Sequence, residues 1–70
     1  MTLGERLRQL REVAGLSQNE LHKRSGVSQA VISAVERDLQ DTITLATATR
    51  LADALGVSLD LLAGRTGERA

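Results

Sequence analysis

Few side chains in this 70-residue chain are suited to covalent chemistry. The chain has one histidine, His22, and neither cysteine nor tyrosine, so few pairs of a nucleophile and a base can form. No ligand-type residues show the spacing of a metal site. Glu5 and Glu12 lie beside arginines on a predicted helix surface, where solvated ion pairs are expected. We therefore predict no enzymatic activity, no metal site and no cofactor.

The informative side chains lie between residues 29 and 37. With a helical repeat, Val31, Ile32 and Val35 point inward. Ala30, Ser33 and Arg37 then point outward, with Gln29 and Ala34 on the flanks, so the outward side chains before the arginine are short or amide-bearing. A helix that only needed solubility would normally carry glutamate and lysine there, so the alternative is a surface helix with few charges.

These short polar and methyl groups fit the chemistry of base edges in duplex DNA. The major groove is about 12 Å wide and admits a helix. In it Gln29 could pair with adenine, Ala30 could contact a thymine methyl and Ser33 could bond to several bases. The chain has no aromatic residue, which disfavours binding of single-stranded nucleic acid by stacking.

The helix that carries these groups is one of five that the capping residues and helix-ending glycines of the sequence predict. Thr2 with Glu5 and Ser17 with Glu20 make capping boxes. Further N-caps are Ser28, Thr44 and Ser58, and glycines that can end helices stand at 15, 26, 56 and 64. We expect helices over about 3–14, 18–24, 29–37, 45–55 and 59–63, with a loop at 38–43. The predicted fold is all-α: a compact five-helix bundle forming one domain over 1–64, with a flexible C-terminal tail at 65–70.

Composition sets weaker limits. The absence of cysteine fits a reducing compartment, and no apolar stretch is long enough for a membrane span or a signal peptide. We therefore expect a soluble cytoplasmic protein with no membrane association. The net charge is zero, but residues 1–37 hold six basic and four acidic side chains, whereas 38–70 hold three and five. The first half is thus the more cationic one.

Residues 18–35 predict two short helices joined by a tight turn. Gly26 can take the positive φ that such a turn needs. Val27 is then expected to be buried beneath the turn, and Leu21 with Ile32 and Val35 can close a small core. This is the helix-turn-helix arrangement.

Four segments carry a family resemblance: 15–21, 26–29, 32–37 and 51–60. Together they resemble the phage repressor/Cro-type, or XRE-like, helix-turn-helix family, over about residues 3–63. The resemblance implies a lambda-repressor-like DNA-binding domain. It also implies a sequence-specific transcriptional regulator, a repressor, that inserts its third helix into the major groove of a palindromic operator as a homodimer.

The resemblance also implies roles for single residues. Gln18, Ser28 and Arg37 would contact DNA phosphates, while Gln29, Ala30, Ser33 and Ala34 would face base edges. Arg11 would pair with Glu36 as a structural brace; the alternative is two unrelated surface charges. Leu59 and Leu62 are candidates for the dimer interface, and intrachain core is the alternative for both.

Two departures from the family pattern favour other interpretations. His22 stands where the family usually has a small residue, and it is either a tolerated half-exposed histidine or a pH switch or ligand. The segment Asp38-Leu39-Gln40-Asp41 is acidic where the family loop is often glycine-rich and basic, which predicts few phosphate contacts and modest affinity. The acidic loop and zero net charge also suit an antitoxin or adaptor, a protein-interaction module whose partner is a toxin or another regulator.

Overall fold

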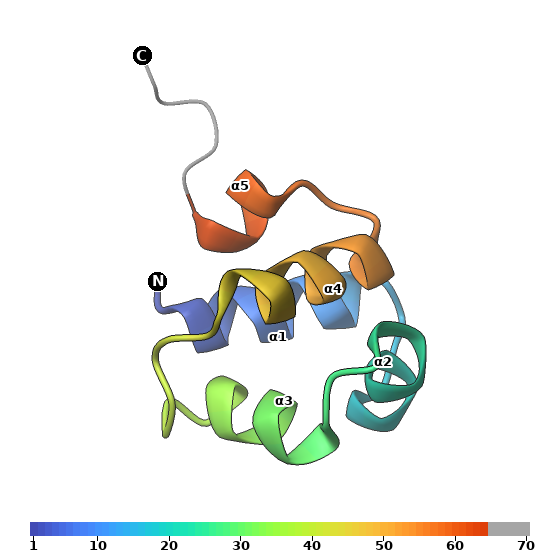
Figure 1. Ribbon diagram of the computed structural model, residues 1–70, viewed down its shortest axis with the longest axis horizontal. Coiled ribbons are helices and arrows are strands. Elements are labelled where there is room, and N and C mark those ends of the chain that lie inside the picture. Colours follow the sequence, from blue (N-terminus) through green and yellow to red (C-terminus); the bar gives the residue numbers. More distant parts are fainter. Residues whose placement is uncertain (65–70) are drawn as a thin grey trace.

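The computed structural model describes residues 1–64, in which five helices and no strand are found (Figure 1). The helices are α1 (Leu3–Val13), α2 (Gln18–Ser25), α3 (Gln29–Glu36), α4 (Leu45–Leu55) and α5 (Leu59–Ala63). The predicted all-α class is therefore confirmed. The tail expected at 65–70 lies outside the described residues. Each of the described helices is too short or too polar to span a membrane.

Each of these helices begins at a serine or threonine whose side chain accepts a hydrogen bond from the backbone N–H three residues later. The caps are Thr2, Ser17, Ser28, Thr44 and Ser58. The side chains of Glu5 and Glu20 in turn accept hydrogen bonds from the backbone N–H groups of Thr2 and Ser17, so both capping boxes are complete. Such caps satisfy N–H groups that a helix leaves without intrahelical partners. Local sequence thus determines where the helices begin.

The loop predicted at 38–43 follows the end of α3, and it begins with an unusual backbone conformation. Asp38 adopts the left-handed conformation, with φ of 58°, in a position where glycine is the usual residue. Its carboxylate accepts a hydrogen bond from the Thr2 hydroxyl at 2.9 Å. One of the two acidic groups in the 38–41 segment is therefore already engaged with the start of α1.

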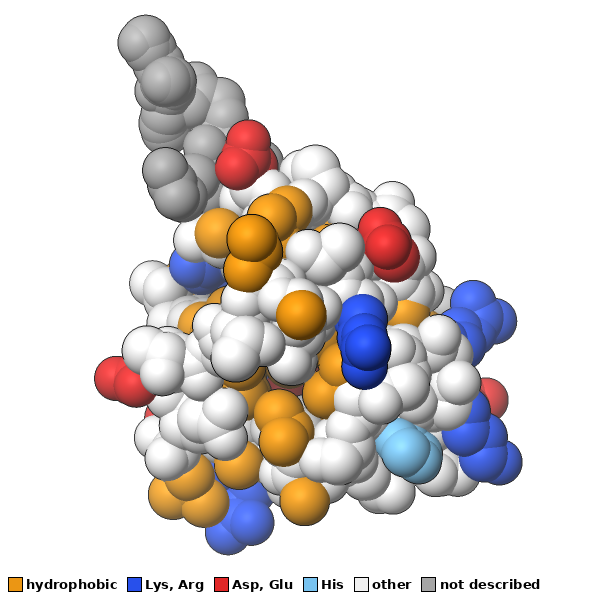
Figure 2. All heavy atoms as spheres, viewed as in Figure 1, with side chains coloured by type: hydrophobic (Ala, Val, Ile, Leu, Met, Phe, Trp, Pro, Cys, Tyr) orange, Lys and Arg blue, Asp and Glu red, His pale blue; other side chains and the backbone are white. Residues whose placement is uncertain are grey.

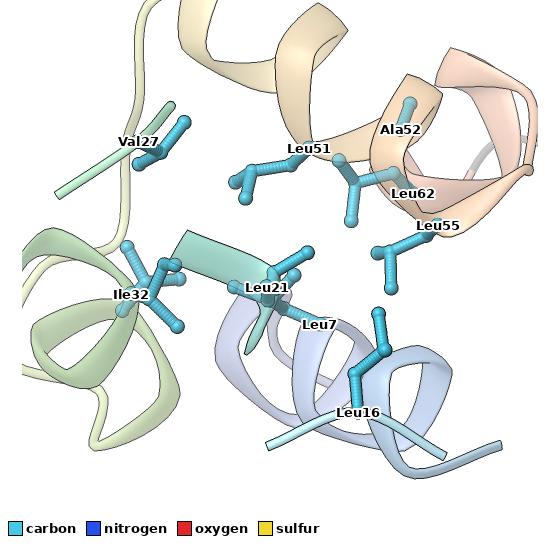
Figure 3. Close-up of a cluster of buried hydrophobic side chains, with 10 residues drawn as sticks. Leu7, Leu16, Leu21, Val27, Ile32, Leu51, Ala52, Leu55 and Leu62 are labelled. Atoms are coloured by element: carbon cyan, nitrogen blue, oxygen red, sulfur yellow. The ribbon is translucent and has the colours of Figure 1, made fainter. Parts of the chain in front are cut away.

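The core is wholly aliphatic within the described residues (Figure 3). It consists of Leu7, Leu16, Leu21, Val27, Ile32, Val35, Leu51, Ala52, Leu55 and Leu62. Leu62 is 1% exposed, so of its two predicted roles the structure favours intrachain core: the side chain packs α5 onto its own chain. Leu59 is 36% exposed and remains available to a partner.

The helices α2 and α3 lie at one end of the bundle and α5 lies at the other (Figure 1). α3 packs against α1 and α2, while α5 packs against α1 and α4. This arrangement anchors α3 from one side and leaves its other side at the surface.

Gly4 permits a close approach between α1 and α3. A Cβ atom at this position would overlap the backbone carbonyl oxygen of Val35 and would lie 2.8 Å from the Asp38 carboxylate. Backbone cannot yield as a flexible side chain can, so any larger residue must push the two helices apart. Gly4 therefore sets the distance at which α1 supports α3.

We expect Gly4→Ala to lower the free energy of unfolding by about 1–3 kcal/mol. In an open helix the same change would raise it by roughly 0.5–1 kcal/mol, because alanine is the better helix former. Denaturant unfolding measures the difference. Gln9→Ala, on the exposed side of α1, is the control and should leave stability nearly unchanged. Stabilisation by Gly4→Ala would contradict the close approach.

Candidate nucleic-acid interface

The turn between α2 and α3 sets the relative placement of these helices. Gly26 ends α2 with φ of 75°, the left-handed conformation that glycine adopts without strain. Val27 follows it and is buried at 6% exposure. Leu21, Ile32 and Val35 are fully buried beneath the turn. The small core predicted from the sequence is therefore present.

The surface side of α3 is most open at its N-terminal half. Gln29 and Ala30 are exposed, whereas Ser33 and Ala34 are half-buried. Within residues 1–64 the Gln29 amide has no hydrogen-bond partner, so its donor and acceptor are both directed to solvent. Ser28 and Arg37 are exposed at the two ends of the helix. The accessible amide and methyl groups thus gather in the first turn, next to the helix N-terminus.

Arg11 and Glu36 form a bidentate ion pair between α1 and the last turn of α3. Arg11 Nε lies 2.7 Å from Glu36 Oε2, and Arg11 Nη2 lies 2.9 Å from Oε1. The side chains are 12% and 3% exposed. Arg11 Nη1 also donates to the Leu16 carbonyl at 2.8 Å. The hydrogen bond to Glu36 raises the pKa of Arg11 above its ordinary value, so the guanidinium stays charged.

Gln18 is tied to the same carboxylate, which the sequence did not indicate. Its Nε2 donates to Glu36 Oε1 at 3.1 Å, and the residue is half-buried at the first position of α2. A glutamine amide has two N–H groups and one carbonyl oxygen. One N–H is used by Glu36, so one N–H is left for the phosphate contact that the family resemblance led us to expect.

The N-terminus of α2 is fixed by its capping box. Glu20 Oε1 accepts a hydrogen bond from the Ser17 backbone N–H at 2.8 Å, and the Ser17 hydroxyl accepts one from the Glu20 N–H at 3.0 Å. The bond from the Ser17 backbone is the main cause that lowers the pKa of Glu20 below its ordinary value of 4.5. This box holds the end of α2 at which Gln18 lies.

In this chain α2 and α3 are joined by a glycine turn and share an aliphatic core, and α3 is open to solvent along its N-terminal half. This arrangement makes the chain a helix-turn-helix protein. Sequence comparison gives the same class, since a helix-turn-helix family model matches residues 7–62. The chain belongs to this family, the phage repressor/Cro-type or XRE-like family that its motifs resemble.

Its relatives are transcriptional regulators. The HTH-type transcriptional regulator SinR of Bacillus licheniformis is 30% identical over 66 residues, which cover 94% of this chain and 60% of SinR. The uncharacterized HTH-type transcriptional regulator y4dJ of Sinorhizobium fredii is 43% identical over 56 residues, 80% of this chain and 71% of that protein. The chain therefore spans about three-fifths of the length of SinR from B. licheniformis.

The fold is also that of a solved protein–DNA complex. The crystal structure of SinR, a master regulator for biofilm formation, in complex with DNA superposes with a TM-score of 0.86 at 31% identity. The match covers 89% of this chain and 98% of that one. The five-helix architecture is therefore the architecture of a DNA-binding relative.

We expect Glu36→Ala to lower the free energy of unfolding by about 3 kcal/mol, because the Arg11 guanidinium would lose its partner in a largely buried place. The matched control is Glu12→Ala. It breaks the Arg8–Glu12 pair, whose side chains are 63% and 57% exposed, and should cost under about 1 kcal/mol. Urea unfolding of both variants makes the comparison. Equal effects would mean that the Arg11–Glu36 pair behaves as a solvated one.

Glu20 should make stability depend on pH on the acid side. A carboxylate whose pKa is lowered by folding stabilises the fold above its unfolded pKa, and this contribution is lost as the pH falls through the lower folded value. We therefore expect the parent to lose its advantage over Glu20→Gln as the pH drops below 4.5. Thermal unfolding of both proteins across that range measures the difference. A constant difference at every pH would contradict the capping assignment.

Proposed function

We propose that this protein is a sequence-specific regulator that binds duplex DNA with α3 in the major groove and represses transcription. The observation that carries the proposal is the open first turn of α3. There Gln29 and Ala30 present an exposed amide and an exposed methyl group, and residues 25–35 carry no charged side chain. These groups match the edges of A·T pairs, since glutamine pairs with adenine and methyls contact thymine. The proposal assigns the protein no catalysis and places it with DNA in the cytoplasm.

Phosphate contacts would come from both ends of the motif. Gln18 and Ser28 lie at the N-termini of α2 and α3, where the helix dipole favours an anion. The Ser28 oxygen accepts the Val31 N–H at 3.1 Å, which leaves the hydroxyl proton for a phosphate oxygen. Arg37 is exposed at the far end of α3. Ser33 and Ala34 are half-buried, so only the exposed part of each side chain would contact base edges in the groove.

The proposed assembly is a homodimer on a pseudo-palindrome. Two copies related by a twofold axis would place their α3 helices in successive major grooves about 10 bp apart. Leu59 of α5 and Leu45 of α4 expose apolar surface, at 36% and 71%, and α5 lies at the end of the bundle opposite α3 (Figure 1). A dimer contact there would leave the readout side of α3 free.

The direct experiment is selection of bound sequences from a pool of random DNA duplexes, followed by titration of the selected duplex at two salt concentrations. We expect an A·T-containing inverted repeat, and an affinity that falls as salt rises because phosphate contacts release counterions. Failure to enrich any sequence, together with binding that salt does not change, would refute the proposal.

We expect Gln29→Ala to weaken binding to the selected duplex by about 1–3 kcal/mol and to relax the base preference at one position. The physical reason is the loss of a bidentate contact to one adenine. Repeating the selection with the variant protein measures the preference at every position. An unchanged sequence profile would remove Gln29 from base readout.

Gln18→Ala provides the contrast, because a phosphate contact carries no sequence information. It should weaken binding to the selected duplex and to a scrambled duplex by similar factors. A change of preference instead would place Gln18 at the bases. Gln18 also bonds to Glu36. The melting temperature of the variant must therefore be measured as well, to distinguish the loss of a DNA contact from a loss of stability.

A second candidate function, a protein-interaction module such as an antitoxin or adaptor, is favoured by one observation. An apolar groove of about 490 Å³ runs between the start of α1, α4 and α5, and Asp41 and Asp60 lie at its edge. Figure 2 shows hydrophobic side chains exposed over α4 and α5 on the same face. Such a groove suits a protein partner, a toxin or another regulator. If this were the main function, the duplex selection above would enrich nothing.

A further inference from the structure

The one histidine of the chain lies against the turn of the helix-turn-helix. His22 Nδ1 is 2.7 Å from the backbone oxygen of Val27, and the residue is half-buried near the end of α2. Because a carbonyl oxygen only accepts hydrogen bonds, Nδ1 must carry the proton. In the neutral ring this leaves Nε2 as the unprotonated nitrogen.

The contact completes a set of hydrogen bonds that hold the turn. The Gly26 N–H donates to the His22 carbonyl at 2.9 Å, and the Val27 N–H donates to the Ser25 hydroxyl at 3.1 Å. With the His22 ring on the Val27 oxygen, both polar backbone groups of Val27 are bonded to side chains of α2. The Val27 side chain is meanwhile buried, so its peptide groups have little freedom to rotate.

The orientation of this peptide determines how α3 begins. The Val27 carbonyl belongs to the peptide bond that leads into Ser28, the N-cap of α3. Its direction therefore fixes where α3 starts relative to α2. Gln29 and Ala30 follow directly after Ser28. A change in the orientation of the turn would therefore displace the groups proposed to read bases. Displacements of this kind reduce affinity even when every contact residue is retained.

We propose that His22 is a positioning residue: its Nδ1–H holds the Val27 carbonyl and thereby sets the angle at which α3 meets DNA. The second half of this statement rests on the proposed function. The first half concerns the free protein alone. It gives the histidine a role in place of the small residue that the family resemblance led us to expect.

The first test reads the protonation of the ring directly. Long-range ¹H–¹⁵N correlation of the free protein, at a pH well above that at which imidazole titrates, distinguishes the protonated ring nitrogen from the bare one. We expect the proton on Nδ1. A proton on Nε2 would overturn the proposal, because the Val27 carbonyl would then face a nitrogen lone pair.

The second test compares two variants. His22→Asn keeps an N–H donor near the position of Nδ1, whereas His22→Ala removes it. In His22→Ala, the Gly26 and Val27 amides should exchange with solvent up to about tenfold faster relative to the Ala48 amide of α4, and affinity for the selected duplex should fall about three- to tenfold. His22→Asn should restore both to within about twofold.

The outcomes separate the two claims. If His22→Ala changes neither exchange at the turn nor affinity, or if His22→Asn behaves as His22→Ala does, the positioning role is refuted. Faster exchange at every amide alike, Ala48 included, would show a general loss of stability and would also refute it. If the parent protein binds no duplex, the proposed function fails, while the tautomer and the exchange rates still decide whether His22 holds the turn.

Discussion

The carboxylate of Glu36 accepts three hydrogen bonds from side chains, two from Arg11 and one from Gln18. These bonds join the last turn of α3 to α1 and to the first residue of α2. Because the Glu36 side chain is 3% exposed, leaving its oxygens there without these partners would be costly. Arg11 extends the network through its bond to Leu16. The C-terminal end of α3 is thus held by polar contacts, while its N-terminal end is held by the turn.

The two kinds of support leave the exposed groups of α3 on a rigid base. At the turn, Gly26 supplies the left-handed conformation, Val27 is buried and His22 bonds to the Val27 carbonyl. Along its inner side α3 rests on α1, at a distance that Gly4 allows. A helix held in this way presents Gln29 and Ala30 in one orientation. That orientation is the preorganisation that a specific contact to base edges requires.

The sequence was sufficient wherever a structural feature is local. Capping boxes at Thr2 and Ser17 predict where helices begin, because the atoms involved lie within three residues of each other. Features that depend on distant neighbours were harder to predict: the Thr2–Asp38 bond and the bond of Gln18 to Glu36 were missed, and the sequence left Leu62 open between intrachain core and a dimer interface. A helical repeat gives the direction of a side chain but not what covers it, which is why Ser33 and Ala34 proved half-buried. The target sequence in DNA is a property of the complex and cannot be read from the chain.

We propose that duplex DNA is bound by the first turn of α3 together with the N-terminus of α2. The most direct measurement is a map of backbone amide shifts as the selected duplex is titrated into ¹⁵N-labelled protein. We expect the largest changes around Gln18 and from Ser28 to Ser33, with Asp53 on the exposed side of α4 little affected. Changes confined to the groove between α4 and α5, with Gln29 and Ala30 unmoved, would contradict it.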